Sequence, residues 1–545
     1  MGFVAPGIDN FHPVYMMSKK VLITDEIHPI CSRLLKEAGY EPLIALKQTP
    51  DELRNICASA DAWIIRSGTT ITADLIAAAA SLQVIGRAGV GVDNVDIKAA
   101  TRAGILVLNA PAGNTISTAE HSMAMLLSLS RRVPGASASV RAGEWNRKEF
   151  TGIELYEKTL GIVGAGKIGR EVAVRALAFG MNVIAVDPVM SAEVAADLGI
   201  SLVPFEEVLT ESDFISIHAP LNDATRDLFN ADTLARCRQG VMIINCARGG
   251  IVNEVDLLEA LTAGHVGGAA LDVYSVEPPT EQLRELLVHP RVVATPHIAA
   301  STDEAQRKVA LQVTEQVIHA LRGESVSTAV NLSIAPAPGM SEYEPYYRLA
   351  TKLGVFSAQM LRGHAYRIKV GCRGEALRSH APNLELAVLQ GFLSTITSAP
   401  VNHVSAPYIA RESGLQSGYE THEVTSAFSS QLDVSLETDS DLIEISGTVF
   451  GDGEELIVRI NGYRLEVRPQ GTILLYQNDD RPGMLASVGA ILATADINIA
   501  SLSLGRKNPG EVALTVISVD EPVGPDVLSA LSEIPGVYAI RSIQL

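Results

Sequence analysis

The segment from Thr159 to Pro188 constrains the fold of this chain more than any other. A short apolar run at 160–163 is typical of a buried strand, and Gly164-Ala165-Gly166-Lys167-Ile168-Gly169 follows it directly. A helical pattern comes next, and a second apolar run at 182–186 ends in Asp187. This order of strand, glycine-rich turn, helix, strand and terminal acid predicts a βαβ unit of the dinucleotide-binding kind.

Each part of that unit has a mechanical reason. Gly164 permits the tight turn, Gly166 lets the backbone approach a pyrophosphate at the helix N-terminus, and Gly169 lets the helix pack closely on the sheet. The carboxylate of Asp187 can accept hydrogen bonds from a ribose 2′-hydroxyl and would repel a 2′-phosphate. An ordinary βαβ turn is the alternative, but the features occur in register. We therefore expect a site for NAD and not for NADP.

Length and composition limit what else the chain can be. With 545 residues it is too long for a single core, so we expect three or four domains. No apolar run reaches the roughly 18 residues of a membrane span, which predicts a soluble protein. A net charge of −19 argues against a nucleic-acid surface. The scattered cysteines lack metal-ligand or CxxC spacing, so we expect no metal site and a reducing, cytoplasmic compartment; they are Cys31, Cys57, Cys237, Cys246 and Cys372.

The chain before the glycine loop alternates short apolar runs with helical patterns. Strands are expected at 21–24, 42–46, 62–65, 84–85 and 106–108, with helices at 27–38 and 50–58. Such alternation predicts a parallel α/β sheet of its own. Residues 1–17 do not resemble a signal peptide and are expected to form a loose extension.

Basic and polar residues follow two of these strands. Arg66 and Ser67 come after the strand at 62–65, and Arg87 comes after the strand at 84–85. Ligands of parallel sheets lie beyond the carboxyl ends of strands, and the arginine fork suits phosphate or carboxylate. We expect these residues to hold an anion, with surface ion pairs as the open alternative for each of them alone.

Beyond Asp187 the alternation continues, and further strands again end in polar residues. Hydride transfer to a 2-oxo acid needs a cation for the carboxylate, an acid for the developing alkoxide and a carboxylate that orients the acid. Arg248, Glu277 and His297 each lie just past such a strand and fit these three roles. Taken singly, an ion pair, a loop acid and a packing histidine are equally good interpretations. Cys246 is interpreted as a small apolar filler near the cofactor.

Two helices are expected to connect the two sheets. A helix at 117–133 should bridge them, and one at 303–321 should pack back on the first sheet.

The last two hundred residues are expected to form separate units. Residues 331–339 have the composition of a linker, and the following segment carries a helix at 349–361 and antiparallel strands over 441–467. Residues 471–545 read strand, helix, strand, strand, helix, strand, which predicts a ferredoxin-like βαββαβ module.

The segments VGAGKIG, NCARGG, LDVYSVEP and TPHIAAST, within about residues 19–331, resemble the D-isomer-specific 2-hydroxyacid dehydrogenases. GRAGVGVDNVD and the C-terminal extension resemble the long, phosphoglycerate-oxidising branch of that family. The resemblance implies NAD-dependent oxidation of D-3-phosphoglycerate to 3-phosphohydroxypyruvate, the first step of L-serine biosynthesis, by a homotetramer. Another 2-hydroxyacid reductase, for glyoxylate or hydroxypyruvate, and a non-enzymatic NAD-sensing corepressor are the alternatives.

The resemblance also implies the boundaries of the domains. A flavodoxin-like substrate domain would comprise 18–116 and 303–331, and a Rossmann NAD domain 117–302. A linker and an α+β intervening domain, similar to an allosteric substrate-binding domain, would span 332–470, and a regulatory ACT domain 471–545.

The family's functional positions can be carried over residue by residue. The implied catalytic residues are Arg248, Glu277 and His297. The implied cofactor contacts are Gly164, Gly166, Lys167, Ile168, Gly169, Asp187, Ala219, Pro220, Cys246, Ala247, Arg248, Asp272, His297 and Ala300. The implied substrate contacts are Arg66, Ser67, Arg87 and Asn114. L-serine feedback would use Asn478, Asp480 and Asn498, the first of which departs from the aromatic or histidine frequent in the family.

Overall fold

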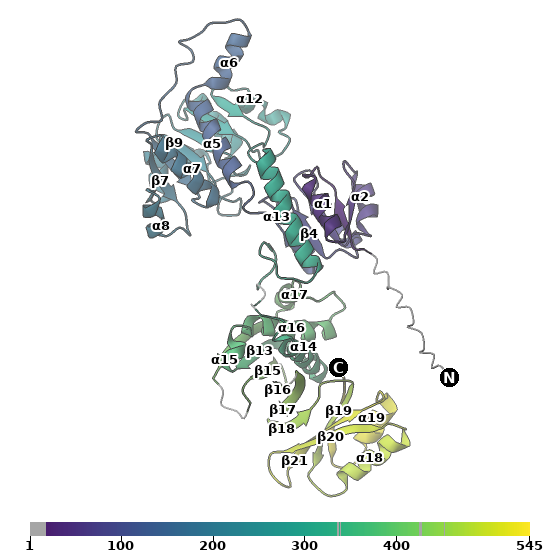
Figure 1. Ribbon diagram of the computed structural model, residues 1–545. Helices are drawn as coiled ribbons and strands as arrows, with labels where there is room; N and C mark the ends of the chain where they lie inside the picture. Colours follow the sequence, from purple (N-terminus) through teal and green to yellow (C-terminus); the bar gives the residue numbers. More distant parts are fainter. Residues whose placement is uncertain (1–17, 335–336, 338, 424–427, 452) are drawn as a thin grey trace, which may run out of the picture.

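The structure is a computed structural model that describes residues 18–334, 337, 339–423, 428–451 and 453–545. The expected extension at 1–17 and part of the expected linker lie outside the described residues. Figure 1 shows two α/β units side by side in the N-terminal half, with a third unit and then a C-terminal unit following them in succession. Each unit is built around one sheet.

The first unit is a parallel sheet in the order β2-β1-β3-β4-β5, which is the flavodoxin-like order. Its strands are β1 (Lys20–Ile23), β2 (Glu41–Ile44), β3 (Ala62–Ile65), β4 (Val84–Arg87) and β5 (Leu106–Leu108). Its helices are α1 (Ile30–Glu37), α2 (Pro50–Cys57), α3 (Ala73–Ala78) and α4 (Ile97–Arg102). Arg87 is the last residue of β4, where the sequence predicted a loop.

Helix α13 (Asp303–Leu321) returns from the second unit and packs in the core of the first. Val313 and Val317 lie against β4, where a Cβ on Gly86 would come within 2.9 and 2.6 Å of their methyl groups. Only a glycine allows the helix to approach the strand so closely. The returning helix therefore joins the two units at the side where their strands end.

The second unit is a parallel sheet in the order β12-β11-β10-β9-β6-β7-β8. Its strands are β6 (Thr159–Val163), β7 (Asn182–Val186), β8 (Ser201–Leu202), β9 (Phe214–Ile217), β10 (Met242–Asn245), β11 (Gly268–Leu271) and β12 (Val292–Ala294). Helices α7 (Lys167–Ala178), α8 (Ala192–Asp197), α9 (Phe205–Glu211), α10 (Ala231–Arg236), α11 (Glu254–Thr262) and α12 (Arg284–Leu287) connect them. The strand order reverses between β6 and β9, and ligands of such sheets bind at this reversal.

The bridging helix differs from its prediction. Instead of one helix over 117–133, α5 (Thr115–Ser130) ends and a separate α6 (Val133–Arg141) begins. Arg132 between them has a φ of 50°, in the left-handed region where a helix cannot continue. Pro134 then occupies the first turn of α6, where its missing N–H costs nothing.

The third unit has a mixed sheet in the order β14-β13-β15-β16-β17-β18. The strands are β13 (Ala365–Arg373), β14 (Gln416–His422), β15 (Gln431–Thr438), β16 (Leu442–Phe450), β17 (Glu454–Ile460) and β18 (Tyr463–Val467). Helices α14 (Glu344–Met360) and α16 (Ala381–Ile396) pack together, with the shorter α15 (Glu375–Arg378) and α17 (Ala406–Glu412) beside them.

The C-terminal unit is an antiparallel sheet in the order β20-β21-β19-β22. It comprises β19 (Thr472–Asp479), α18 (Met484–Thr494), β20 (Ile499–Arg506), β21 (Val512–Val519), α19 (Pro525–Ser532) and β22 (Val537–Gln544). Leu474 and Tyr476 pack under the helices, whereas Ile473 and Leu475 join the core of the third unit. Alternate side chains of β19 therefore point to opposite faces of the sheet, one face packing on the third unit and the other on helices α18 and α19. Over the described residues, no helix is both long and apolar enough to traverse a bilayer.

Candidate active site

The glycine loop between β6 and α7 has the geometry that its sequence predicts. Gly164 has a φ of 93°, and a Cβ there would lie 2.8 Å from the backbone nitrogen of Ala219. A Cβ on Gly169 would lie 2.2 Å from the carbonyl oxygen of Gly164, so the helix packs on the turn at a distance that only glycine allows. A Cβ on Gly166 would meet nothing within 4 Å. The space over Gly166, at the start of α7, can hold a pyrophosphate.

Asp187 follows β7, next to that loop. One carboxylate oxygen accepts from the backbone N–H of Ala165 at 2.8 Å, and the other accepts from Val189 and Met190, each at 2.8 Å. A carboxylate has about four acceptor positions. The side chain therefore holds the glycine loop and retains capacity for a ribose hydroxyl.

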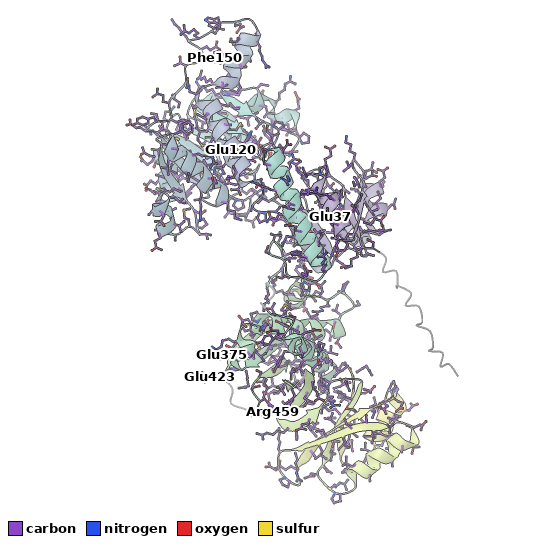
Figure 2. The ribbon with its side chains drawn as sticks, in the orientation of Figure 1. Glu37, Glu120, Phe150, Glu375, Glu423 and Arg459 are labelled. Atoms are coloured by element: carbon purple, nitrogen blue, oxygen red, sulfur yellow. The ribbon has the colours of Figure 1, made fainter. Side chains whose placement is uncertain are left out.

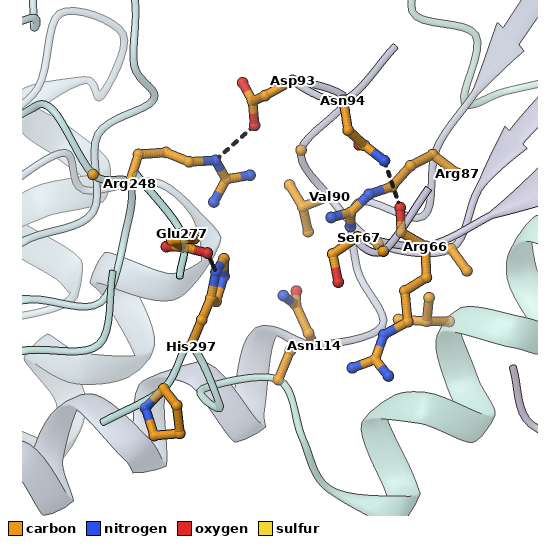
Figure 3. A pocket seen from close by; sticks show the side chains of 18 of the residues that line it. Arg66, Ser67, Arg87, Val90, Asp93, Asn94, Asn114, Arg248, Glu277 and His297 are labelled. Atoms are coloured by element: carbon orange, nitrogen blue, oxygen red, sulfur yellow. Dashed lines mark hydrogen bonds and ion pairs between the residues drawn. The ribbon is translucent and has the colours of Figure 1, made fainter. Parts of the chain in front are cut away.

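A cavity of about 1000 Å³ lies between the first and second units. Figure 3 shows Arg248, Glu277 and His297 on one side of it, with Arg66, Ser67 and Arg87 across from them and Asn114 between. Ala300 also lines it. The sequence-predicted catalytic and substrate residues, taken from both units, are thus brought to one space.

His297 and Glu277 form a close pair on the second unit. Nδ1 of His297 lies 2.6 Å from Oε2 of Glu277, and the backbone N–H of Tyr274 donates to Oε1 at 3.1 Å. Burial alone would raise the pKa of Glu277, but these hydrogen bonds outweigh it and hold the pKa below its usual range. Because an ionised carboxylate only accepts, Nδ1 carries the proton, and Nε2 is left as the ring's free acceptor.

The loop that carries His297 is held by a buried carboxylate. Asp272, whose side chain is fully buried, accepts from Thr295 Oγ1 at 2.5 Å and from the backbone N–H groups of Ile298 and Ala299, each at 2.9 Å. Burial would raise the pKa of Asp272, but these bonds and one from His121 keep it below its usual range. His297 itself has a φ of 53°, a conformation that costs energy in a non-glycine residue. Asp272 supports that conformation from both flanks.

Arg248 crosses from the second unit to the first. Its Nε lies 3.0 Å from Oδ2 of Asp93, and its Nη1 donates to the carbonyl of Ala247 at 2.7 Å. A Cβ on Gly91 would lie 1.8 Å from Nη2, so only glycine lets the guanidinium pass at this point. These contacts hold the guanidinium of Arg248 at the cavity between the first and second units.

The first unit contributes polar atoms that have no partner. Nε of Arg87 and Oδ1 of Asn114 are buried, and neither has a hydrogen bond within the described structure. Burial and the neighbouring Arg248 lower the pKa of Arg87 to about 10, so it stays charged at neutral pH. Leaving such atoms unpaired is costly, which makes this wall of the cavity a candidate ligand site.

Neighbouring residues shape the remainder of the site. Asp25 at the end of β1 accepts from the backbone N–H groups of Arg66 and Thr69, and Asn94 donates to their carbonyl groups, so the loop with Ser67 is fixed from two sides. Burial raises the pKa of Cys246 to about 12, which makes it the neutral filler that the sequence predicted.

The remaining expected cofactor positions surround the same strand ends. Ala219 and Pro220 follow β9 and Ala247 follows β10, whereas Lys167 and Ile168 begin α7.

Residues 123–299 match the family described as "D-isomer specific 2-hydroxyacid dehydrogenase, NAD binding domain". Residues 342–461 match "D-3-phosphoglycerate dehydrogenase intervening domain", and residues 472–536 match "ACT domain". The D-3-phosphoglycerate dehydrogenase of Bacillus subtilis (strain 168) is 40% identical over 528 residues, covering 96% of this chain and 99% of that protein. This chain belongs to the D-3-phosphoglycerate dehydrogenase family.

The D-3-phosphoglycerate dehydrogenase of Methanocaldococcus jannaschii is 39% identical over 527 residues. The match covers 96% of this chain and 100% of that protein. Solved structures resemble the first two units. A glyoxylate reductase from Paecilomyes thermophila is 33% identical with a TM-score of 0.53, covering 58% of this chain and 99% of its own. An NAD-dependent formate dehydrogenase from Staphylococcus aureus in complex with NAD is 30% identical with a TM-score of 0.53, covering 58% of this chain and 100% of its own.

Membership of the family establishes the enzyme class and the cofactor. The chain is an NAD-dependent dehydrogenase with parallel α/β units, an intervening domain and an ACT domain. The third unit is the intervening domain, and the C-terminal unit is the ACT domain.

The expected regulatory residues do not meet within one chain. Asn478 is buried on β19 and bonded to Thr515 at 2.8 Å, and Asp480 accepts from Arg506 and from the backbone of Gly510. Asn498 donates to Asp520 and precedes β20.

β19 and β20 start at the same end of the sheet, because Thr472 and Ile499 both pair with Val519. The eight residues of β19 therefore separate Asn498 from Asp480 by roughly 25 Å.

Sequence reasoning missed several residues that shape the site. Asp93 lies within the GRAGVGVDNVD segment, yet nothing in its spacing indicates a partner on another unit. Asp25 could have been found, because it follows the first strand as Arg66 follows the third. His121, on α5, reaches Asp272 at 3.3 Å only through the packing of that helix.

Proposed function

We propose that this NAD-dependent dehydrogenase oxidises D-3-phosphoglycerate to 3-phosphohydroxypyruvate, the first step of L-serine biosynthesis. One observation carries the proposal: the acid–base pair of His297 and Glu277 shares a cavity with Arg87, whose guanidinium has no ion-pair partner among the described residues. A phosphorylated hydroxy acid can place its reacting hydroxyl against the His297–Glu277 pair and its phosphate against Arg87. The full-length relatives in Bacillus and Methanocaldococcus carry the same name.

In the proposed mechanism, Nε2 of His297 accepts the proton of the C2 hydroxyl during oxidation. Glu277 keeps the ring in the tautomer that leaves Nε2 free and stabilises the cation that forms. Arg248 binds the carboxylate and polarises the developing carbonyl, for which its fork is suited. NAD, when bound, accepts the hydride.

Substrate phosphate is proposed to lie against the first unit. Arg66, Ser67 and Arg87 present two guanidinium groups and a hydroxyl to the cavity, and Asn114 presents an amide. Charge-assisted bonds from arginine to phosphate are among the strongest hydrogen bonds in proteins. A substrate without phosphate would leave buried Arg87 unpaired, which is the basis of selectivity.

The cofactor is proposed to extend from Asp187, at the ribose, across Gly166 to the cavity. The other contacts are Gly164, Lys167, Ile168, Gly169, Ala219, Pro220, Cys246, Ala247, Arg248, Asp272, His297 and Ala300. The open space at Gly166 supports this path. Asp272 is included for its position beneath the catalytic loop, although its carboxylate is covered in the described arrangement.

The proposed division of labour follows the units. Residues 18–116 with 303–331 bind substrate, 117–302 bind NAD, 332–470 form the linker and intervening domain, and 471–545 form the regulatory domain. A cytoplasmic location is proposed because the cysteines are buried free thiols.

L-serine is the proposed effector of the ACT domain. β20 is an edge strand, and antiparallel pairing of two β20 strands would bring Asn498 of one copy toward Asp480 of the other. Gly483, at the start of α18, leaves backbone N–H groups for the carboxylate of the amino acid. Only a pair of chains would then complete the site.

A homotetramer is proposed from two separate self-contacts. Besides the β20 edge, the arm around α6 exposes large apolar side chains: Trp145 is 77% exposed and Val140 is 57% exposed. Figure 2 shows this arm, with Phe150 labelled, projecting from the second unit. Exposed apolar groups of this size indicate a protein interface. Two different two-fold contacts generate a tetramer.

The experiment that tests the proposed reaction is product identification. Purified protein with NAD and D-3-phosphoglycerate should form NADH and an equal amount of 3-phosphohydroxypyruvate, measured by mass spectrometry of a hydrazine adduct. The glyoxylate reductase relative lacks counterparts of the last two units, so that activity is the less favoured alternative. NADH formation from glycolate, with none from D-3-phosphoglycerate, would favour it instead.

A further inference from the structure

A second cavity, of about 200 Å³, lies where the intervening and ACT domains meet. Its walls come from the end of α14, β16 and β17 on one side and from β19, β21 and β22 on the other. Leu475 and Leu514 supply an apolar floor that belongs to the shared core. Pockets preferentially hold ligands at such domain junctions. Its lining residues all lie between 360 and 541, and none of them lines the catalytic cavity.

Three charged side chains line this small cavity: Arg362, Arg541 and Asp441. The described residues give none of them an ion-pair partner; Arg541 donates only to the neighbouring carbonyl of Ile540, at 3.1 Å. Burial and the proximity of Arg362 lower the pKa of Arg541 below its usual range. Two guanidinium groups near each other are unfavourable unless an anion joins them.

The strand that carries Arg541 is distorted at the cavity. Leu475 pairs with Arg541 and Gln477 with Tyr538, so β22 has an irregularity between these pairs. Ala539 within it has a φ of 49°, which is costly for a residue with a Cβ. Such irregularities re-aim side chains, and retained strain concentrates at ligand sites. Here both Ala539 and Arg541 line the cavity.

We propose that this cavity binds a small carboxylate that carries a hydrogen-bond donor on its α-carbon, the class of α-amino and α-hydroxy acids. Arg362 and Arg541 hold the carboxylate, because their planar forks match its geometry. Asp441 accepts from the α-ammonium or α-hydroxyl group. The volume is below the roughly 300–1,000 Å³ of pockets for drug-sized ligands, which restricts the ligand to a few carbon atoms. Since both domains form the walls, an occupant stabilises their contact.

Three probes of the same carbon skeleton test the assignment: propionate, L-lactate and L-alanine. Each is titrated calorimetrically into the full chain. L-lactate, L-alanine or both should bind at least about tenfold more tightly than propionate, because only they offer a donor to Asp441. The better probe identifies the hydroxyl or the ammonium as the recognised group.

Substitutions locate the binding in this cavity. Arg362→Gln combined with Arg541→Gln should weaken binding about tenfold or more, and Asp441→Asn should bring the better probe close to propionate. Arg459→Gln combined with Arg464→Gln is the matched control, since it removes two charges from exposed positions on the intervening domain; Figure 2 labels Arg459. If circular dichroism shows the double variant to be unfolded, Arg541→Lys is used in its place. It keeps the positive charge but loses the planar guanidinium, so it should also weaken binding.

Four outcomes would overturn the proposal. They are the absence of saturable binding by any probe at tens of millimolar, propionate binding as well as L-lactate and L-alanine, binding unchanged in the arginine variants, and binding of inorganic phosphate in preference to all three. L-lactate lodged in the catalytic cavity would bind the arginine variants unchanged and so falls under the third outcome.

Discussion

Oε2 of Glu277 lies 2.6 Å from Nδ1 of His297, at the edge of a cavity that Arg87 lines from the other unit. The histidine and the carboxylate come from successive loops of the second unit, and the arginine ends a strand of the first. The chemistry of proton transfer and the recognition of an anion are therefore built on different sheets.

His297→Ala should remove proton transfer and leave cofactor binding. General acid–base catalysis contributes roughly 10²–10⁴-fold, so kcat should fall by about that factor. NADH affinity, measured by fluorescence titration, should fall far less than turnover, because the glycine loop is untouched and His297 is only one of the proposed cofactor contacts. A variant that keeps nearly full turnover would contradict the assignment of His297.

Asp187→Ala should weaken NAD binding and admit NADP. The carboxylate supplies charged hydrogen bonds worth about 1–3 kcal/mol, so kcat/KM with NAD should fall by roughly 5- to 150-fold. The preference for NAD over NADP should narrow because a negative charge no longer faces a 2′-phosphate. If the unmodified enzyme uses both cofactors equally, Asp187 does not select between them.

Asp272 makes the stability of the catalytic loop dependent on pH. Its folded-state pKa is depressed, so its stabilising contribution is complete above the unfolded value of about 3.9 and is lost as pH falls through the folded pKa. Asp272→Asn should therefore lower the free energy of unfolding by about 1–3 kcal/mol at pH 7. The difference from the unmodified protein should shrink below about pH 4.

Denaturant unfolding at several pH values measures this difference. A gap that stays constant down to pH 3 would show that the carboxylate does not hold the loop. Because Asn keeps the shape of the side chain, Asp272→Ala serves as a control that also loses the packing.

Arg66→Ala should discriminate between phosphorylated and unphosphorylated substrates. Its KM for D-3-phosphoglycerate should rise about tenfold or more, while that for D-glycerate should change little, since the charge-assisted bonds exist only where a phosphate is present. Arg66→Lys keeps the positive charge without the planar guanidinium, so its KM for D-3-phosphoglycerate should lie between those of the unmodified enzyme and Arg66→Ala. Equal losses for both substrates would make the side chain of Arg66 structural, because the backbone bond of residue 66 to Asp25 is retained in the variant.

Asp480→Ala should abolish inhibition by L-serine and leave basal turnover unchanged. The carboxylate already accepts from Gly510 and Arg506, and the ammonium of serine would join these donors across a pair of β20 edges. The control is Asp51→Ala, which removes an exposed acid from α2 of the first unit, outside the ACT domain. Inhibition that survives Asp480→Ala would place serine elsewhere.

Much of the fold could be predicted because its signals are local. The buried run at 62–65 and the helix at 303–321 agree with the structure to the residue. A continuous apolar run defines the strand, and an N-cap with acidic residues in the first turn defines the start of the helix. The break at Arg132 was missed because a left-handed residue other than glycine leaves no mark in composition. Helix α16 was missed because its nearly uniform apolar sequence has no amphipathic period.

The candidate site could be predicted where residues follow strands of parallel sheets. That rule placed Arg66 and Arg87 at the carboxyl ends of strands in the first sheet, and Arg248 and His297 at those of the second. It says nothing about distances between the units. The bond between Asp93 and Arg248 depends on how the two units face each other, which no local pattern encodes. The separation of Asn498 from Asp480 likewise follows from strand direction and not from sequence spacing.

The central claim is that the cavity between the units oxidises a phosphorylated hydroxy acid. Its most direct test is NADH formation by the full chain with NAD, comparing kcat/KM for D-3-phosphoglycerate, D-glycerate and D-lactate. Each charged hydrogen bond to the phosphate is worth about 1.5–3 kcal/mol, so D-3-phosphoglycerate should exceed the other two by at least about tenfold. Equal or better use of D-glycerate or D-lactate would contradict the claim.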